Sequence, residues 1–546
     1  MFKVDFINYF EEAIKKHWDL PAFSDVEGEP IDYKTVASKI YWLHNLLAEF
    51  GVKRGDKVAL LGKNSTNWAI TYLSIITYGA VVVPILPNFT SEDMSHIIKH
   101  SESKLLFIGN SIMDSIEESE IPTLEGIIHL DNFTLVNTII NAELKKKINL
   151  ALAKKYDVSK DKFMLPKGIT NNTLGEIVYT SGTTGFTKGV MLPLNSLIVN
   201  IVFAQETLAF RTGSQMLSFL PLSHAYACAF DFLYPFSCGV HVHFLGKIPS
   251  PKLLLKHLKE ISPEIILSVP LILEKIIKKN IFPLLEKKSI KVITAIPGVK
   301  QAFYSKVKKQ LLSVFGGSLQ EMIIGGAPLN AEVEKFLKEI KFPFTVGYGM
   351  SECGPLISYA AWNKHKYRSS GQIVNYLQAK VDSPDPATIP GDIWVKGEQV
   401  TTGYYKNPEA TKEVFKADGW FNTGDIGLID QENFIFIKGR SKNLILGSGG
   451  ENIYPEAVEQ TFNNLPYVQE SLVVERSNKL VILVYPDVEE ADKEGISQTM
   501  YPKLMEQNKN IYNETAPAYA KIAEVKIVPE PFLKTPTQKI KRYMYK

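Results

Sequence analysis

A short stretch between residues 179 and 190 combines the kinds of side chain that could hold a phosphate group. Its sequence, YTSGTTGFTKGV, contains five Ser or Thr hydroxyls, three glycines and one lysine. Glycines let the backbone turn tightly and present N–H groups to an anion, hydroxyls donate further hydrogen bonds, and lysine adds a movable positive charge. Lys188 follows Gly185 after two residues and precedes a glycine, which is not the spacing of a Walker A loop. The alternative is a polar surface loop, which Gly/Ser/Thr clusters usually are.

Three further motifs in the middle of the chain could contribute to the same chemistry. Residues 322–329 read MIIGGAPL, an apolar run ending in a glycine turn against which a planar base could lie. Residues 347–354 read GYGMSECG, and the Glu352 carboxylate is a suitable ligand for a hard cation that also binds substrate phosphates. Residues 419–425 read GWFNTGD and place Asp425 on a glycine-bordered turn, which suits hydrogen bonds to a ribose diol.

The C-terminal part of the chain, from residue 439 onward, contains three more motifs of this kind. Residues 439–442 read GRSK, residues 447–456 read GSGGENIYPE, and residues 535–542 read TPTQKIKR. The second is a glycine loop that leads into a helix, and the third places three cations close together near the C-terminus. A simple turn would explain any one of these motifs, but it does not explain all of them in one order.

Taken in order, these motifs resemble the signature sequences of the adenylate-forming superfamily, which includes acyl-CoA synthetases, luciferases and nonribosomal adenylation domains. The resemblance runs from about residue 8 to the C-terminus. It is strongest to long-chain fatty acyl-CoA synthetases, because residues 268–276 read SVPLILEKI, a run typical of that group. Three positions depart from the usual pattern, since Thr187 replaces proline, Ser351 replaces threonine and Gln538 replaces glycine.

The resemblance implies a role for each motif. It implies catalytic roles for Lys188, Glu352 and Lys539, with Glu352 also holding Mg²⁺, and the choice of Lys539 over Lys541 rests on motif alignment. The residues that it implies for ATP binding are Thr180, Ser181, Gly182, Thr183, Thr184, Gly185, Gly326, Ala327, Pro328, Tyr348, Gly349, Ser351, Asp425 and Arg440. The remaining implied roles are the acyl pocket for His224 and Gly325, the hinge for Lys442 and the CoA-side loop for Gly449 and Gly450.

The elements that position these motifs belong to an α/β protein. Between residues 31 and 109, helical patterns at 33–50, 67–77 and 91–100 alternate with strand patterns at 57–61, 80–85 and 104–108. Such alternation predicts a parallel α/β layer. The resemblance implies a large N-terminal domain, residues 1–441, of α/β layers with a small β-barrel. It also implies a small mobile α+β domain, residues 442–546.

Composition narrows the functional classes further. The net charge of +3 gives no indication of a nucleic-acid partner, and the three cysteines have no metal-ligand spacing and fit a reducing compartment. Residues 69–86 are apolar but predict a buried helix and strand rather than a membrane span. His241 and His243 alternate along a predicted strand without a third metal ligand. We therefore expect a cytoplasmic protein.

One charged segment leaves two interpretations open. Residues 141–162 are rich in lysine, which usually indicates a solvated helix and linker. The alternative is a basic face attracted to an anionic membrane, which would place the protein peripherally on the inner membrane surface.

The sequence thus predicts an ATP-dependent fatty acid–CoA ligase that uses ATP, Mg²⁺ and CoA. An acyl-carrier-protein ligase, with a carrier protein as partner, is the main alternative. An aryl-CoA ligase and an inactive nucleotide- or lipid-binding sensor are two others. Retention of Lys188, Glu352, Asp425, Arg440 and Lys539 argues against the sensor. The sequence does not indicate the acyl chain length or the oligomeric state.

Overall fold

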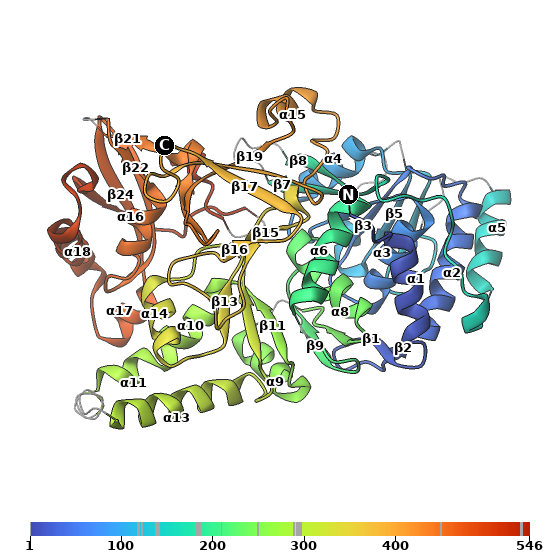
Figure 1. Cartoon of the computed structure of the whole chain (residues 1–546), viewed down its shortest axis with the longest axis horizontal. Coiled ribbons are helices and arrows are strands. Elements are labelled where there is room, and N and C mark those ends of the chain that lie inside the picture. Colours follow the sequence, from blue (N-terminus) through green and yellow to red (C-terminus); the bar gives the residue numbers. More distant parts are fainter. Residues whose placement is uncertain are drawn as a thin grey trace.

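The computed structural model describes residues 2–116, 121, 124–136, 142–154, 156–181, 187–208, 210–247, 250–287, 290, 298–447, 450–535 and 539–545. The chain runs from α/β layers at one end of the molecule to a smaller C-terminal region at the other (Figure 1). The expected α/β fold class is confirmed by the mixture of parallel sheets, antiparallel sheets and flanking helices.

A six-stranded sheet with the order β6-β5-β3-β4-β7-β8 forms the first layer. Its strands are β3 (Lys57–Leu61), β4 (Val81–Ile85), β5 (Leu105–Ile108), β6 (Gly126–His129), β7 (Leu174–Ser181) and β8 (Thr187–Pro193). All neighbours pair in parallel except β7 and β8, which form an antiparallel hairpin. Every residue of β4 and β5 is buried, as expected for parallel strands covered on both faces.

The helices predicted around this sheet are confirmed. They are α2 (Tyr33–Glu49), α3 (Thr66–Tyr78) and α4 (Ser91–Ser101). The side chain of Asp32 accepts a hydrogen bond from the Thr35 backbone N–H and caps α2, which begins at the predicted residue 33. Ten residues of α3 are buried, so its apolar sequence reflects a core position. No helix within the described residues is long and apolar enough to cross a membrane.

A second sheet, β2-β1-β10-β9, packs in the same half of the molecule. Its strands are β1 (Pro21–Asp25), β2 (Ile31–Asp32), β9 (Gln215–Ser218) and β10 (His241–Phe244). The neighbouring helices are α1 (Phe6–Lys16), α6 (Leu194–Thr207), α7 (Ala225–Ala227) and α8 (Tyr234–Ser237), with α5 (Ala142–Ala153) farther out. Phe23 of β1 stacks on Phe236 of α8 with ring centroids 5.0 Å apart, which joins this sheet to its helices.

The third layer is a parallel sheet of β11 (Ile265–Ser268), β12 (Glu321–Ile324) and β13 (Phe344–Val346). Its helices are α9 (Pro251–Ile261), α10 (Pro270–Asn280), α11 (Phe282–Glu286), α13 (Val299–Val314) and α14 (Ala331–Glu339). Helices α11 and α13 project along the lower edge of the molecule (Figure 1).

Two antiparallel sheets follow the third layer in the chain. One contains β14 (Tyr348–Gly349), β15 (Leu356–Tyr359) and β16 (Gln372–Ile373), and the other contains β17 (Leu377–Asp382), β18 (Gly391–Gly397), β19 (Phe421–Ile429) and β20 (Ile435–Arg440). A bridge between Gln372 and Phe434 joins the two sheets. Helix α15 (Pro408–Val414) lies between β18 and β19 in the chain.

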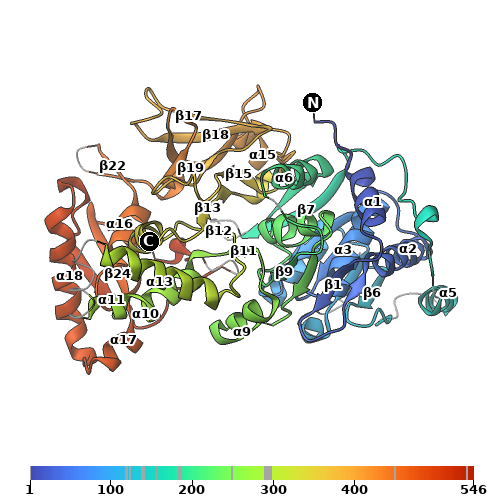
Figure 2. The same ribbon diagram turned by 60° about the horizontal axis from the view of Figure 1, so that its bottom comes forward.

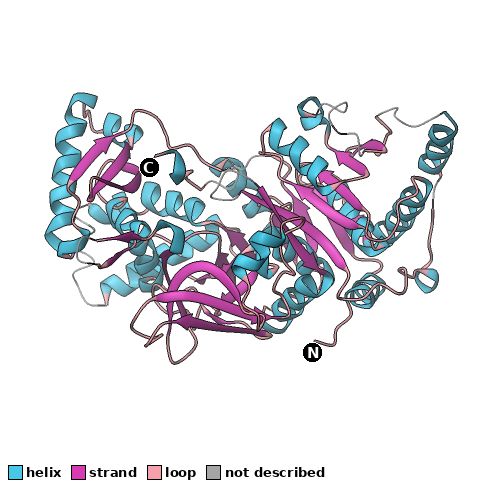
Figure 3. Cartoon of the chain, turned by 90° about the horizontal axis from the view of Figure 1, so that it is seen from above, coloured by secondary structure: helices cyan, strands magenta, loops and turns pink. Residues whose placement is uncertain are grey.

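The C-terminal region contains a sheet of β23 (Val468–Arg476), β24 (Lys479–Pro486) and β25 (Glu524–Ile527). Its other elements are β21 (Ile445–Leu446), β22 (Asn452–Ile453), α16 (Pro455–Phe462), α17 (Val488–Lys493) and α18 (Tyr501–Thr515). Helices cover this sheet at the left of Figure 3. Two hydrophobic clusters, one including Met505 and the other Phe532, are built from residues 445 to 545. This region therefore has a core of its own.

Candidate functional site

The β7–β8 hairpin presents the predicted phosphate loop. Thr180 pairs with Lys188 and Ser181 pairs with Thr187, so the two strands bring the ends of the loop together. Gly182, Thr183, Thr184 and Gly185 lie outside the described residues. The Nζ atom of Lys188 lies 4.8 Å from the ring centroid of Tyr404, within cation–π range.

Glu352, the predicted metal ligand, lies beside the same tyrosine. The Tyr404 hydroxyl donates a 3.0 Å hydrogen bond to Glu352 Oε1. Tyr404 and Glu352 are 7% and 9% exposed, so this bond is largely shielded from water. Tyr404 therefore positions one carboxylate oxygen and contacts the Lys188 ammonium group. These two contacts of Tyr404 could not be predicted from the sequence, because they depend on the fold.

Asp425, Tyr348 and Arg440 form a second cluster. The Tyr348 hydroxyl donates to Asp425 Oδ2 at 2.6 Å, and Arg440 Nε lies 2.7 Å from Asp425 Oδ1. Asp425 pairs with Arg440 across β19 and β20, which explains why these two side chains meet. Burial raises the pKa of Tyr348, and the Asp425 carboxylate raises it further. Tyr348 thus stays protonated and donates to Asp425.

The predicted catalytic lysine, Lys539, belongs to the C-terminal region, and its charge interacts with groups of both clusters. The pKa of Lys539 is lowered, mainly by burial and further by the nearby Arg440 cation. The Asp425 and Glu352 carboxylates act in the opposite direction and raise it. The side chain nevertheless remains accessible to water. Burial lowers the pKa of His224 to about 4, and the Lys539 charge contributes in the same direction. The described structure therefore brings Lys539 within electrostatic range of Glu352, Asp425, Arg440 and His224.

The second predicted acyl-pocket residue, Gly325, directly follows β12 and lies against Tyr226. A Cβ atom at this position would approach the Tyr226 ring to 3.0 Å, and the Tyr226 hydroxyl donates to the Ile323 backbone oxygen at 3.1 Å. Gly326, Ala327 and Pro328 follow as an exposed turn before α14. Gly326 has a φ of +87°, a conformation that favours glycine.

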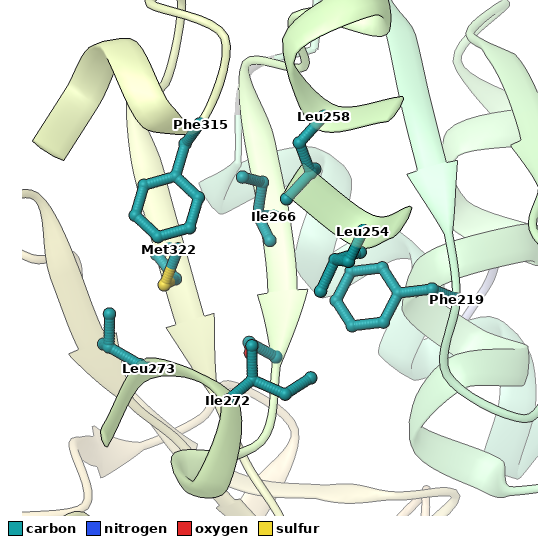
Figure 4. Close-up of a pocket in the computed structure, with 9 residues that line it drawn as sticks. Phe219, Leu254, Leu258, Ile266, Ile272, Leu273, Phe315 and Met322 are labelled. Atoms are coloured by element: carbon teal, nitrogen blue, oxygen red, sulfur yellow. The ribbon is translucent and has the colours of Figure 1, made fainter. Parts of the chain in front are cut away.

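An apolar crevice lies beside this turn, between β11, β12, α9 and α10 (Figure 4). Its walls include Leu254, Ile266, Leu273, Phe315 and Met322. Its volume of about 10 Å³ is close to that of a single water-sized sphere, so an acyl chain would have to displace side chains to enter.

The other predicted site residues lie in separate turns. Gly349 belongs to β14, where a Cβ atom would come within 2.2 Å of the Pro355 backbone oxygen, and Ser351 is buried just after it. Lys442 is exposed in the turn after β20. Gly450 is exposed in the turn between β21 and β22, whereas Gly449 lies outside the described residues.

Polar contacts hold the C-terminal region against the third layer. Gln460 of α16 donates through Nε2 to the Leu329 backbone oxygen at 3.1 Å, and its Oε1 accepts from Arg368 Nη2. On α10, Lys279 forms a 2.8 Å ion pair with Glu489 of α17, and Figure 2 shows these helices near each other. These contacts fix the arrangement in which Lys539 reaches the site.

The paired histidines of β10 lie outside this site. The His241 and His243 ring centroids are 4.0 Å apart, and His243 bonds Ser24 through Nδ1 at 2.9 Å and Gln215 through Nε2 at 2.8 Å. No group of three or more metal-binding side chains occurs in the part of the chain that the structure describes.

Comparison with known proteins identifies the family. The model of the AMP-binding enzyme family matches residues 10–405. The chain is 29% identical over 492 residues to the long-chain-fatty-acid–CoA ligase FadD15 of Mycobacterium bovis, which covers 83% of this chain and 77% of that protein. It is 27% identical over 629 residues to the chloroplastic long-chain-fatty-acid–[acyl-carrier-protein] ligase AEE15 of Arabidopsis thaliana, covering 98% and 84%.

A solved structure agrees with these sequence matches. The O-succinylbenzoate coenzyme A synthetase MenE of Bacillus subtilis, in complex with ATP and magnesium ion, superposes with a TM-score of 0.75 over 98% of both chains at 20% identity. The superfamily predicted from the motifs is thus confirmed, and the chain belongs to the family of AMP-binding enzymes.

Proposed function

We propose that this protein is an ATP-dependent fatty acid–CoA ligase that forms an acyl-adenylate and then a thioester, releasing pyrophosphate and AMP. The single observation that carries the proposal is that Lys539 lies within electrostatic range of Glu352, Asp425, Arg440 and His224. These groups come from separate motifs, and their chemical types suit the binding of a nucleotide and a carboxylate. The similarity to FadD15 supports a fatty acid as the substrate.

In the first step, an oxygen of the fatty carboxylate attacks the α-phosphorus of ATP, and the bond to the pyrophosphate oxygen breaks. Such a displacement depends mainly on positioning and on neutralising negative charge. Lys188 and Lys539 supply positive charge to the phosphates. The Asp425 carboxylate oxygens already accept hydrogen bonds from Tyr348 and Arg440. Their remaining lone pairs can accept hydrogen bonds from the ribose hydroxyls of ATP.

Glu352 is the residue that would hold Mg²⁺. Tyr404 occupies one carboxylate oxygen with a hydrogen bond, which leaves the second oxygen for the cation, and oxygen ligands are those that Mg²⁺ prefers. When bound, the cation would neutralise phosphate charge. ATP and CoA enter as substrates.

The second step requires a thiol to attack the acyl carbonyl, with AMP as the leaving group. We assign residues 1–441 to the N-terminal adenylation domain and residues 442–546 to a mobile C-terminal domain, with the hinge at Lys442. Rotation there removes Lys539 from the site and brings the loop with Gly449 and Gly450 to the acyl group. One site then serves two reactions.

An acyl-carrier-protein ligase is the second candidate. The observation that favours it is the similarity to AEE15, which covers 98% of this chain. The partner in that case is a separate carrier protein instead of CoA. We place either enzyme in the cytoplasm, with peripheral contact to the inner membrane surface.

The experiment that tests the proposal is a measurement of AMP release with ATP and Mg²⁺ over carboxylates of increasing chain length and aryl acids, each with and without CoA. AMP that appears only with CoA and a fatty acid supports the ligase. If acyl-adenylate accumulates and CoA does not change its amount, the carrier-protein ligase is favoured. Absence of pyrophosphate exchange with every acid would indicate a sensor.

A further inference from the structure

The segment that contains α10, α11 and α13 differs in charge from the rest of the protein. Residues 270–314 contain ten lysines and two glutamates, a formal charge of +8, whereas the whole chain carries +3 and the remainder therefore −5. Two of its helices, α11 and α13, lie along the lower edge of the molecule (Figure 1). A concentrated charge of this kind attracts an oppositely charged surface.

Several of these lysines form no ion pair in the part of the chain that the structure describes. Lys279 pairs with Glu489 and Lys300 with Glu339, but within the described residues Lys287, Lys306 and Lys309 have no acidic partner. Lys306 and Lys309 lie three residues apart and are both exposed. They therefore share one outward face of α13 with Val299, which precedes Lys306 by two helical turns.

Apolar side chains are exposed on the same projection. Leu271 of α10, Leu284 of α11 and Val299 of α13 are 52%, 47% and 42% exposed. The apolar crevice lies at the base of the projection, because Leu273 of α10 and Phe315, directly after α13, form part of its wall. Exposed lysines and apolar side chains together fit a lipid surface better than an acidic protein, which would need only the charge.

We propose that the projection formed by α10, α11 and α13 docks on an anionic lipid bilayer, with Lys287, Lys306 and Lys309 facing the lipid phosphates and Leu284 and Val299 contacting the acyl region. This inference deepens the proposed function, on which it rests for the identity of the substrate. A fatty acid that partitions into the bilayer would then be close to the crevice. The basic helix α5, which the sequence suggested as a membrane face, is not part of this surface.

The test is co-sedimentation of the full chain with vesicles of pure phosphatidylcholine and with vesicles of equimolar phosphatidylcholine and phosphatidylglycerol. We expect binding to the anionic vesicles that weakens as salt is raised. Since a lysine near an anionic surface contributes about 1 kcal/mol, the double variant Lys306→Gln/Lys309→Gln should bind roughly 30-fold more weakly. The double variant Leu284→Ser/Val299→Ser should lose the binding that persists at high salt.

The matched control is Lys145→Gln/Lys146→Gln on α5, which removes the same charge from exposed positions outside the projection. The control should bind within twofold of the wild type. Equal weakening by both lysine pairs, or equal binding to both kinds of vesicle, would overturn the proposal. The proposal would also be overturned if the projection bound an acidic carrier protein and did not bind vesicles.

A separate readout distinguishes this inference from the proposed function. Pyrophosphate exchange with a short, water-soluble carboxylate does not require a membrane, and the Lys306→Gln/Lys309→Gln variant should retain the wild-type rate. Loss of vesicle binding with normal exchange supports the lipid surface. A wild type that binds anionic vesicles but exchanges no pyrophosphate contradicts the proposed function alone.

Discussion

Removal of the Gln460 side chain should separate the two half-reactions. Gln460 lies on α16 of the C-terminal region and makes two contacts with the N-terminal part of the chain, one to the Leu329 backbone oxygen and one from Arg368. Both contacts belong to the arrangement in which Lys539 is beside Glu352 and Asp425. The variant Gln460→Ala removes both and leaves the 3.0 Å ion pair between Arg368 and Glu334 in place.

The size of the effect follows from these two hydrogen bonds. A hydrogen bond contributes about 1 kcal/mol net, so their loss should weaken docking by about 2 kcal/mol. That corresponds to a roughly 30-fold smaller equilibrium constant for docking, which lowers the docked population by up to the same factor. Contacts such as Lys279 with Glu489 remain, and they limit the loss. We therefore expect adenylation to slow by about 10- to 30-fold.

The assay compares two rates in the same preparation. Pyrophosphate exchange reports adenylation, and thioester formation from supplied acyl-adenylate reports the second step. The second rate should change less than twofold, because it does not use the docked arrangement. Gln460→Glu should lose less, since the new carboxylate keeps the Arg368 contact. Thr461→Ala, one residue later on α16 and exposed, is the matched control. An equal loss of both rates in Gln460→Ala would refute the reasoning, as would no loss of either.

Three further substitutions test individual side chains. Lys539→Ala should reduce adenylation by at least about a hundredfold while largely sparing thioester formation from supplied acyl-adenylate, and an equal loss of both contradicts the two-state account. Tyr404→Phe removes the 3.0 Å hydrogen bond to Glu352, so the Mg²⁺ concentration for half-maximal pyrophosphate exchange should rise about fivefold. An unchanged Mg²⁺ dependence would show that Tyr404 does not position that carboxylate. Glu176 is buried in β7, and this burial raises its pKa to about 8 from an ordinary value of 4.5. Between pH 4.5 and 8 the Glu176 carboxyl therefore keeps its proton in the folded protein and loses it when the chain unfolds. Between these two values the wild type should lose about 1.4 kcal/mol of unfolding free energy per pH unit from this group, and Glu176→Gln should abolish that slope. Denaturant unfolding of both proteins at several pH values measures the difference, and parallel pH profiles would contradict it.

The sequence predicts local structure well where a single cause determines it. Residues 81–85 are apolar without interruption and form a central parallel strand, and Asp32 caps α2 through its own side chain. The predicted helices and strands between residues 31 and 109 agree with the structure to within a residue or two because such signals are local.

Contacts between residues that are far apart in the chain could not be predicted from the sequence. Tyr404 and Glu352 are separated by 52 positions, and their hydrogen bond depends on how two layers pack. The same holds for Gln460 and Leu329, separated by 131 positions. The motifs indicated which residue types belong to the site, and the family match supports them as a set. The role of each residue stays a prediction that the substitutions above can test.

The charges of the site suggest why Lys539 should be able to leave it. Arg440 and Lys539 are both cations, and the proximity of Arg440 lowers the pKa of Lys539, which means that docking brings like charges together. The phosphates of ATP offset this repulsion, so ATP binding and docking should favour each other, and by linkage each should strengthen the other equally. Adenylation converts the triphosphate into an acyl-adenylate, a mixed anhydride with a single phosphate, and releases pyrophosphate, which removes most of the negative charge. Only the Asp425 and Glu352 carboxylates then offset the repulsion between Arg440 and Lys539, so undocking of the C-terminal region becomes more favourable when the acyl group is ready for the thiol.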